Sequence, residues 1–270
     1  MSESLRKRIA TAAVLIALLL AVLFWLPPAA TIVLLTLVVL MGAWEWSAFL
    51  KWNDPRRRAC YVILVAVLLP IAWRVTRTPW GLEVLLAVAL LWWLIALSWI
   101  VLAPRRVQPW SAGLAGLLSL VPAWLALTRL RVQTPHGAEW VLFALVLVWM
   151  ADVGAYFCGR RFGRRRLAPS VSPGKTWEGA LGGLATSGIV AVAGGVWFRL
   201  PLQQFLVLCL AAVAFSIVGD LTESLLKRFA GMKDSGTLFP GHGGVMDRID
   251  SVTGAAPVLL LGLTFLGVLP

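Results

Sequence analysis

Acidic residues concentrate in one stretch of this chain. Twelve of the 270 residues are Asp or Glu, and five of these fall within 31 positions: Asp220, Glu223, Asp234, Asp247 and Asp250. Lysines and arginines alternate with them, and the glycine-rich segment 236–244 interrupts the run. Carboxylates can hold Mg²⁺, cations can hold phosphate oxygens, and glycines let backbone amides approach a ligand. The combination is typical of a metal-assisted phosphate site.

The alternative interpretation is a solvated loop whose charges pair with one another, which is the commoner origin of a charged run. Here Asp220 and Asp247 adjoin apolar runs, and Asp152 lies inside a third. An unpaired carboxylate is costly in a membrane. One cation shared by these three carboxylates is the simplest way to neutralise them. For Asp152 alone, pairing with an arginine or capping of a helix is an equally good explanation.

The basic segment 159–176 offers a second set of groups that can bind phosphate. The tripeptide Gly-Lys-Thr that ends at Thr176 resembles the end of a P-loop, but proline stands where that motif requires its first glycine, and no strand is predicted before it. We expect Lys175 and the hydroxyls of Ser172 and Thr176 to bind phosphate at the start of the following helix. We interpret the arginines of this segment as signals of membrane topology and as contacts to anionic lipid, rather than as catalytic residues.

The composition requires membrane helices to position these groups. Hydrophobic residues make up 60% of the chain, charged residues 13%, and the mean hydropathy is +0.87, which excludes a soluble globular domain. We predict an all-α polytopic membrane protein with about nine transmembrane helices. The apolar runs cover residues 9–26, 29–50, 59–73, 80–102, 110–128, 139–158, 177–197, 203–225 and 252–269. The formal charge of +12 falls in short loops, so an anionic leaflet explains it better than nucleic acid.

The distribution of lysine and arginine predicts the orientation. With a cytoplasmic N-terminus, 19 of the 24 basic residues lie on the cytoplasmic side, in accord with the positive-inside rule, and the C-terminus lies outside. We interpret the first apolar run as an uncleaved helix, because it is long enough to span and no cleavage site follows it. The three cysteines lack the spacing of metal ligands, and we expect no disulfide.

Charge also divides the chain into two regions. The first five apolar runs contain almost no internal charge except Glu45 and Glu83, so we predict that residues 1–130 form a scaffold. Residues 131–270 form the predicted catalytic region, with cytoplasmic loops at 159–176 and 226–250. If the eighth helix continues past its apolar run, Glu223 and Lys227 pair at i, i+4.

Fixed positions in the C-terminal half resemble the signature of the phosphatidate cytidylyltransferases, also called CDP-diacylglycerol synthases. The chain reads Ser224-x-x-Lys227-Arg228, then Lys233-Asp234-x-Gly236, then Phe239-Pro240-x-His242-Gly243-Gly244-x-x-Asp247-Arg248-x-Asp250. A Ser-Pro-x-Lys-Thr-x-Glu-Gly element, here beginning at Ser172, also recurs in that family. The resemblance is strong over residues 150–255. It implies transfer of a cytidylyl group from CTP to phosphatidic acid in phospholipid biosynthesis, in a bacterial cytoplasmic membrane with the active site facing the cytoplasm.

The resemblance and the residue types together suggest roles. Catalytic roles are predicted for Asp220, Lys227, Asp247 and Arg248. Substrate binding is predicted for Ser172, Lys175, Thr176, Ser224, Arg228, Lys233, Asp234, His242, Gly243 and Gly244. Mg²⁺ is the expected cofactor, with Asp220 and Asp247 as its first ligands and Asp152 and Asp250 next. The expected in-line attack at the α-phosphorus needs positioning and charge neutralisation rather than a strong base.

Two other functions stay open. A CDP-alcohol phosphotransferase would carry an Asp-x-x-Asp-Gly-x-x-Ala-Arg pattern, which this sequence lacks. A transporter could use the carboxylates for ion coupling, although charges at the bilayer midplane and an inverted repeat would then be expected. The sequence does not fix the acyl-chain preference, the route of lipid entry or the oligomeric state, for which a homodimer is possible.

Overall fold

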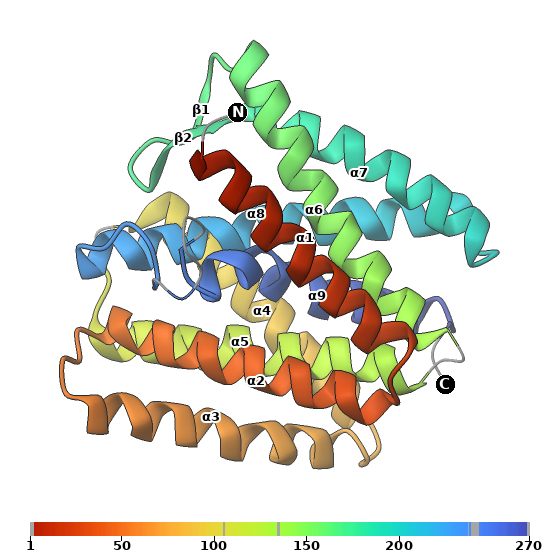
Figure 1. Cartoon of the computed structure of the whole chain (residues 1–270), viewed down its shortest axis with the longest axis horizontal. Coiled ribbons are helices and arrows are strands. Elements are labelled where there is room, and N and C mark those ends of the chain that lie inside the picture. Colours follow the sequence, from red (N-terminus) through yellow and green to blue (C-terminus); the bar gives the residue numbers. More distant parts are fainter. Residues whose placement is uncertain (1–2, 105, 134–135, 237, 239–242, 269–270) are drawn as a thin grey trace.

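Nine α-helices form most of the described chain (Figure 1). The computed structural model describes residues 3–104, 106–133, 136–236, 238 and 243–268, with backbone alone for residues 3–12. The helices are α1 (Glu3–Phe24), α2 (Pro28–Trp46), α3 (Pro55–Val75), α4 (Gly81–Leu102), α5 (Pro109–Gln133), α6 (Gly137–Phe162), α7 (Trp177–Trp197), α8 (Leu202–Ala230) and α9 (Met246–Phe265). A 3₁₀ turn, η1 (Ser47–Leu50), follows α2, and strands β1 (Arg166–Ala168) and β2 (Ser172–Thr176) form an antiparallel hairpin between α6 and α7.

Eight of the described helices, α2 to α9, are long and apolar enough to cross a membrane. In α1 the apolar part, Ala13–Phe24, is shorter. Large apolar side chains stay exposed on the outer faces of several helices, among them Ile63, Leu91 and Ile189, and such faces suit lipid rather than water. The prediction of an all-α polytopic membrane protein is confirmed.

The helix boundaries differ from the predicted apolar runs where the helix ends are polar. α9 begins at Met246 instead of 252, and α8 continues to Ala230 instead of 225. α6 likewise reaches Phe162, and the remainder of the predicted loop 159–176 contains the β1–β2 hairpin. Hydropathy marks the apolar part of a helix, whereas backbone hydrogen bonds extend the helix into polar segments. Lys227 and Arg228 therefore lie on α8, and Asp247, Arg248 and Asp250 lie on α9.

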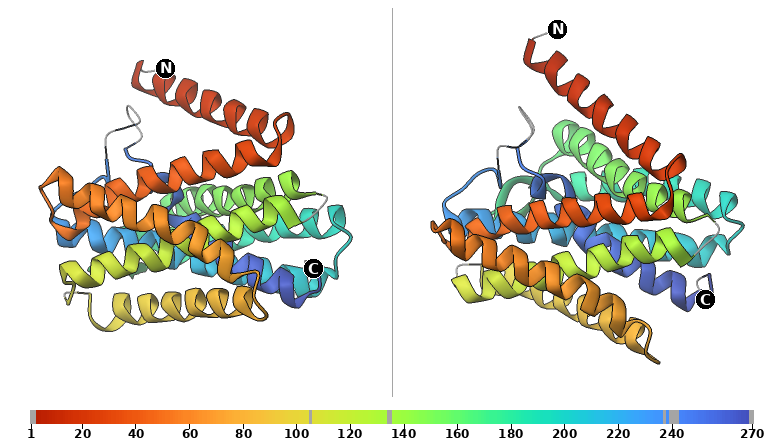
Figure 2. Two further views of the ribbon diagram at one scale, coloured as in Figure 1. Left: turned by 90° about the horizontal axis from the view of Figure 1, so that it is seen from below. Right: turned by 60° about the horizontal axis from the view of Figure 1, so that its bottom comes forward.

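α9 runs through the centre of the bundle. It contacts α8, α5, α4, α6 and α2, and every residue from Asp250 to Leu260 is buried. α5 is also largely enclosed, whereas Figure 2 shows α1 at the periphery, where it packs on α2 and α6. The core of the protein therefore holds the first turns of α9, which carry Asp247 and Asp250.

Successive helices cross the bundle in alternating directions (Figure 1). The connections after α2, α4, α6 and α8 gather at one end of the bundle together with the β1–β2 hairpin, on the left in Figure 1. These connections include the basic loops from which the cytoplasmic side is predicted. The assignment of this end to the cytoplasm stays a prediction.

Small residues bring α6 and α7 into close contact. A Cβ atom on Gly182 of α7 would overlap the side chain of Cys158 on α6. The hydroxyl of Thr186 donates a hydrogen bond to the carbonyl oxygen of Met150 at 2.7 Å, from the same side of α7. This contact fixes α7, and the hairpin that precedes it, against the helix that carries Asp152.

We expect Gly182→Ala to destabilise the protein, although alanine favours a helix over glycine by about 1 kcal/mol. The added methyl group overlaps Cys158, and overpacking of this kind costs about 1–3 kcal/mol. Thermal unfolding in detergent should therefore shift to lower temperature. Gly188→Ala is the matched control, because the nearest atom to a Cβ there is 3.9 Å away, and it should unfold at the same or a higher temperature. Equal shifts for the two variants would contradict this account.

Candidate active site

The β1–β2 hairpin is anchored to the start of α7. The Glu178 carboxylate on α7 accepts a hydrogen bond at 3.0 Å from the backbone N–H of Arg164, which lies just before β1. Thr176 caps α7, because its hydroxyl accepts a hydrogen bond from the backbone N–H of Gly179 at 3.1 Å. Lys175, which immediately precedes this cap, is therefore held at the junction between the hairpin and α7.

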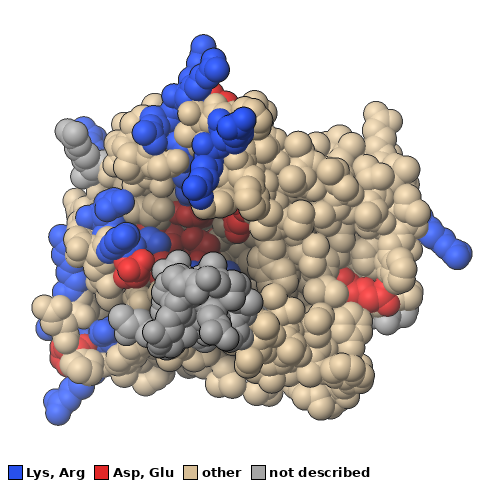
Figure 3. All heavy atoms as spheres, turned by 45° about the horizontal axis from the view of Figure 1, so that its top comes forward, with Lys and Arg blue, Asp and Glu red and all other residues tan. Residues whose placement is uncertain are grey.

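A polar pocket of about 490 Å³ lies between α6, the hairpin, α7, α8 and α9. Its lining includes Asp152, Lys175, Thr176, Asp220 and Ser251. The ammonium group of Lys175 forms an ion pair with the Asp220 carboxylate. Asp152 lies within electrostatic range of Asp220, Lys175 and Arg248. Figure 3 shows acidic side chains recessed in a hollow, with lysine and arginine side chains above it and to its left.

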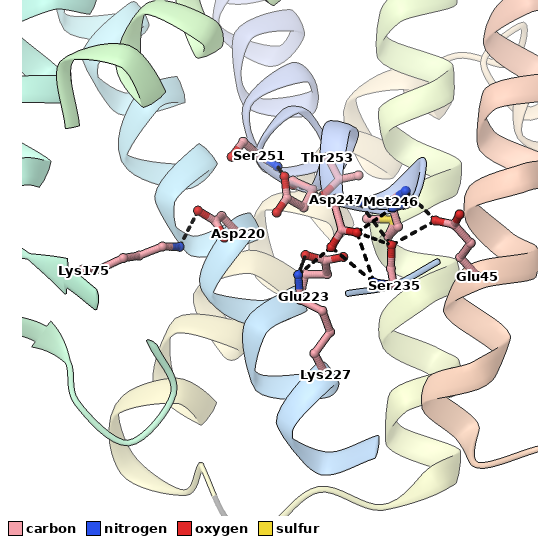
Figure 4. A network of polar contacts seen from close by, with 12 residues as sticks. Glu45, Lys175, Asp220, Glu223, Lys227, Ser235, Met246, Asp247, Ser251 and Thr253 are labelled. Atoms are coloured by element: carbon pink, nitrogen blue, oxygen red, sulfur yellow. Dashed lines mark hydrogen bonds and ion pairs between the residues drawn. The ribbon is translucent and has the colours of Figure 1, made fainter. Parts of the chain in front are cut away.

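A second group of polar contacts surrounds Asp247 in the first turn of α9 (Figure 4). This group, named here the Asp247 network, consists of Glu223, Lys227, Ser235, Gly244 and Asp247. Lys227 Nζ lies 2.7 Å from Asp247 Oδ1 and 2.6 Å from Glu223 Oε2. Asp247 Oδ2 accepts hydrogen bonds from the Gly244 N–H at 2.8 Å and from the Ser235 hydroxyl at 3.0 Å. The predicted i, i+4 pair of Glu223 with Lys227 is confirmed.

Asp250 lies between the pocket and the Asp247 network. Its side chain is buried, and its Oδ1 accepts a hydrogen bond at 2.7 Å from the backbone N–H of Ser251, which lines the pocket. Its carboxylate interacts electrostatically with Asp220 of the pocket and with Glu223 of the network. The pocket and the network therefore form one continuous acidic region across α8 and α9.

The charges of this region suit a divalent cation. By formal charge, the five carboxyl groups there (Asp152, Asp220, Glu223, Asp247, Asp250) outnumber the three basic groups that interact with them (Lys175, Lys227, Arg248) by two. Carboxylate oxygens are preferred ligands of Mg²⁺ and Ca²⁺. Among the described His, Cys, Asp and Glu residues, no three are arranged as a metal site. Asp220 and Asp247 form ion pairs with Lys175 and Lys227 instead. The predicted metal-ligand roles stay predictions.

The remaining predicted site residues lie around these two groups. Gly243 adjoins the network with a φ of +80°, and Ser172 pairs with Ala168 in the hairpin. Ser224 is half-buried on α8, whereas Arg228, Lys233, Asp234 and Arg248 are exposed. His242 lies outside the described residues. The roles assigned to this outer set also stay predictions.

Three residues in or beside the Asp247 network carry no role in the sequence prediction: Glu45, Glu223 and Ser235. Glu45 is 7% exposed and accepts hydrogen bonds from the start of α9. A lone carboxylate inside an apolar run could have identified it, because such a group needs a partner in a membrane. Ser235 occupies an unspecified position of the signature, so its residue type alone did not distinguish it.

Comparison with known proteins agrees with the signature. A sequence model of the Cytidylyltransferase family matches residues 6–266. A phosphatidate cytidylyltransferase of Pseudomonas aeruginosa is 44% identical over 262 residues, which cover 94% of this chain and 95% of the relative. A phosphatidate cytidylyltransferase of Haemophilus influenzae is 38% identical over 281 residues, which cover 94% of this chain and 96% of the relative. The chain therefore belongs to the cytidylyltransferase family.

Proposed function

We propose that this protein transfers a cytidylyl group from CTP to phosphatidic acid, yielding CDP-diacylglycerol and pyrophosphate for phospholipid biosynthesis. The observation that carries the proposal is the acidic region, edged by lysine and arginine, at one end of a membrane bundle in a chain of the cytidylyltransferase family. Both relatives named above are phosphatidate cytidylyltransferases. Such a region suits two anionic substrates, one held in the bilayer and the other dissolved in water.

The reaction is an in-line displacement at the α-phosphorus of CTP. A phosphate oxygen of phosphatidic acid forms the new bond, while the bond from the α-phosphorus to the bridging oxygen breaks and its electron pair leaves with pyrophosphate. The second pKa of a phosphomonoester is about 6, so the attacking phosphate is largely dianionic at neutral pH. A strong general base is therefore unnecessary, and the protein has to position two anions and offset their repulsion.

The lysines of the site, which now pair with carboxylates, can bind substrate phosphates in their place. Lys175 pairs with Asp220, and Lys227 pairs with Asp247 and Glu223. Mg²⁺ held by Asp220 and Asp247, with Asp152 and Asp250, would neutralise charge on the phosphates. The two ammonium groups can then donate charge-assisted hydrogen bonds to phosphate oxygens.

We infer that the site faces the cytoplasm of a bacterial cell, with the protein in the cytoplasmic membrane. The basic loops at the same end of the bundle support this orientation, and it gives CTP direct access. A homodimer is a possible assembly, and light scattering of the purified protein in detergent distinguishes it from a monomer.

Purified protein in detergent should release pyrophosphate when Mg²⁺, phosphatidic acid and CTP are supplied together. UTP and ATP should react at least about tenfold more slowly, since a site that hydrogen-bonds one base rejects others. Asp220→Asn should lower the rate by about 100-fold or more, because it removes a charge that faces the reacting groups. Asp54→Asn is the matched control, because Asp54 caps α3 outside the site and asparagine can also cap a helix.

Binding of Mn²⁺, followed by electron paramagnetic resonance, separates a metal role from a folding defect in the same variants. Asp220→Asn and Asp152→Asn should weaken Mn²⁺ binding, whereas Asp54→Asn should not. If these variants lost pyrophosphate release but bound Mn²⁺ as the wild type does, the proposed reaction would stand, and the metal ligands would have to be other residues. A wild-type protein that forms no product with any nucleotide would contradict the proposed function.

Lys175→Gln should reduce kcat/KM for CTP by roughly 10- to 100-fold, since a charge-assisted hydrogen bond contributes about 1.5–3 kcal/mol. Steady-state kinetics with varied CTP measures this loss. Lys51→Gln is the control, because Lys51 lies outside the pocket, with its ammonium 4.1 Å from the centre of the Phe229 ring. Wild-type kinetics for Lys175→Gln would exclude this lysine from phosphate binding.

An apolar groove follows the polar pocket along the same pair of helices, α7 and α8. It is lined by Leu184, Ala185, Gly188, Ile189, Val192, Leu206 and Leu210. The polar pocket is lined by earlier residues of α7, up to Gly183, and by later residues of α8, from Ile217. We infer that an acyl chain of phosphatidic acid lies in this groove while its headgroup occupies the pocket.

Gly188→Leu should fill the groove and raise the KM for long-chain phosphatidic acid about threefold to tenfold, because it displaces apolar contacts of the chain. The KM for CTP and for short-chain phosphatidic acid should stay unchanged. Val196→Leu is the control, since Val196 is exposed on α7 outside the groove. An equal effect on long and short lipids would contradict the assignment of the groove.

A further inference from the structure

Glu45 lies on α2, in the region predicted to be a scaffold, yet its carboxylate reaches the start of α9 (Figure 4). Its side chain is 7% exposed. A buried carboxylate is stable only when hydrogen-bond donors replace the water it has lost. The donors that Glu45 binds therefore indicate its role.

Two backbone donors at the start of α9 satisfy the Glu45 carboxylate, and a serine hydroxyl lies beside it. The Val245 N–H donates to Oε1 at 3.0 Å, and the Met246 N–H donates to Oε2 at 2.7 Å. The hydroxyl of Ser235 lies 3.0 Å from Oε2. Val245 occupies the N-cap position of α9 and offers no polar side chain. Glu45 thus caps α9 from another helix, and its charge suits the positive end of the helix dipole.

Two glycines of the signature, Gly236 and Gly244, lie against this carboxylate. A Cβ atom on either glycine would overlap an oxygen of Glu45. Any other residue at these positions would have to displace the carboxylate from the amides that it binds. The two glycines therefore leave the space that the carboxylate occupies.

Ser235 links Glu45 to Asp247. The hydroxyl of Ser235 lies 3.0 Å from Glu45 Oε2 and 3.0 Å from Asp247 Oδ2, and it accepts a hydrogen bond from the Asp247 N–H at 3.3 Å. The backbone N–H of Ser235 also donates to Asp247 Oδ2 at 3.1 Å. Through Ser235 and the first amides of α9, Glu45 fixes the position in which Asp247 meets Lys227.

We propose that Glu45 is a positioning residue of the transfer site. Its carboxylate holds Ser235 and the backbone of Val245 and Met246 at the first turn of α9, so that Asp247 and Lys227 face the substrates. Glu45 does not line the polar pocket, and it acts through these residues without touching substrate. The inference rests on the proposed function, because that function defines the task of Asp247 and Lys227.

Glu45→Gln keeps the shape of the side chain but replaces one acceptor oxygen with an N–H₂ donor, so the N–H groups of Val245 and Met246 no longer each face an oxygen of their own. We expect kcat for pyrophosphate release to fall about tenfold or more, since leaving a buried donor unsatisfied is costly. The KM values for CTP and phosphatidic acid should change less than about threefold, because the substrate contacts remain. Glu83→Gln, in the first turn of α4, is the matched control and should keep wild-type kcat.

Hydrogen exchange of backbone amides tests the same contact without turnover. In Glu45→Gln the amides of residues 245–246 should exchange about tenfold faster, and those of α6 and α7 should be unchanged. Unchanged exchange at residues 245–246, faster exchange in all helices, or local exchange with wild-type kcat would each overturn the positioning role. The wild-type protein could fail to form product even though Glu45→Gln shows faster exchange at residues 245–246. That result would overturn the proposed function, and with it the role of Glu45 in the transfer reaction, while the contact between Glu45 and α9 would stand.

Discussion

An excess of carboxylates over basic side chains in one region is the constraint on which this structure depends. Carboxylates from α6, α8 and α9 lie within electrostatic range of one another; Glu223 and Asp250 are buried, and Asp152 lines the pocket. Lys175, brought in by the hairpin, and Lys227, on α8, offset part of their negative charge. The glycine contact between α6 and α7 and the central course of α9 keep the acids together despite their repulsion. A divalent cation held here, as proposed above, would lower this repulsion further.

Helices rather than loops carry most of this charge. Asp220, Glu223 and Lys227 lie on α8, and Asp247 and Asp250 lie on α9, within helix ends that extend beyond the apolar runs. Side chains on packed helices are held more precisely than side chains on loops. Arg228 and Lys233, by contrast, are exposed at the edge of this region. The acidic centre is therefore held by packed helices, with exposed basic side chains beside it.

The sequence predicted the parts of the molecule that depend on local composition. Hydropathy located the membrane helices, because spanning depends on apolar length. Charge within or beside apolar runs singled out Asp152 and Asp220, which line one pocket with Lys175, and also Asp247, which lies in the neighbouring network. The hairpin was missed, because a segment rich in arginine, proline and glycine carries no strand periodicity. The contact of Glu45 with Val245, 200 residues away in the chain, was missed because the packing of distant helices leaves no local pattern.

The fit of Glu45 against Gly236 and Gly244 has a consequence for how the sequence can change over evolution. A side chain at either glycine displaces the carboxylate, and loss of the carboxylate leaves amides at the start of α9 unpaired. Each single change is therefore harmful in the presence of the other two residues, which is epistasis with an identifiable steric cause. An alanine at Gly236 becomes tolerable only after position 45 has shortened and another group has taken over the amides of Val245 and Met246. The three positions are therefore expected to change together, through compensating substitutions, rather than one at a time.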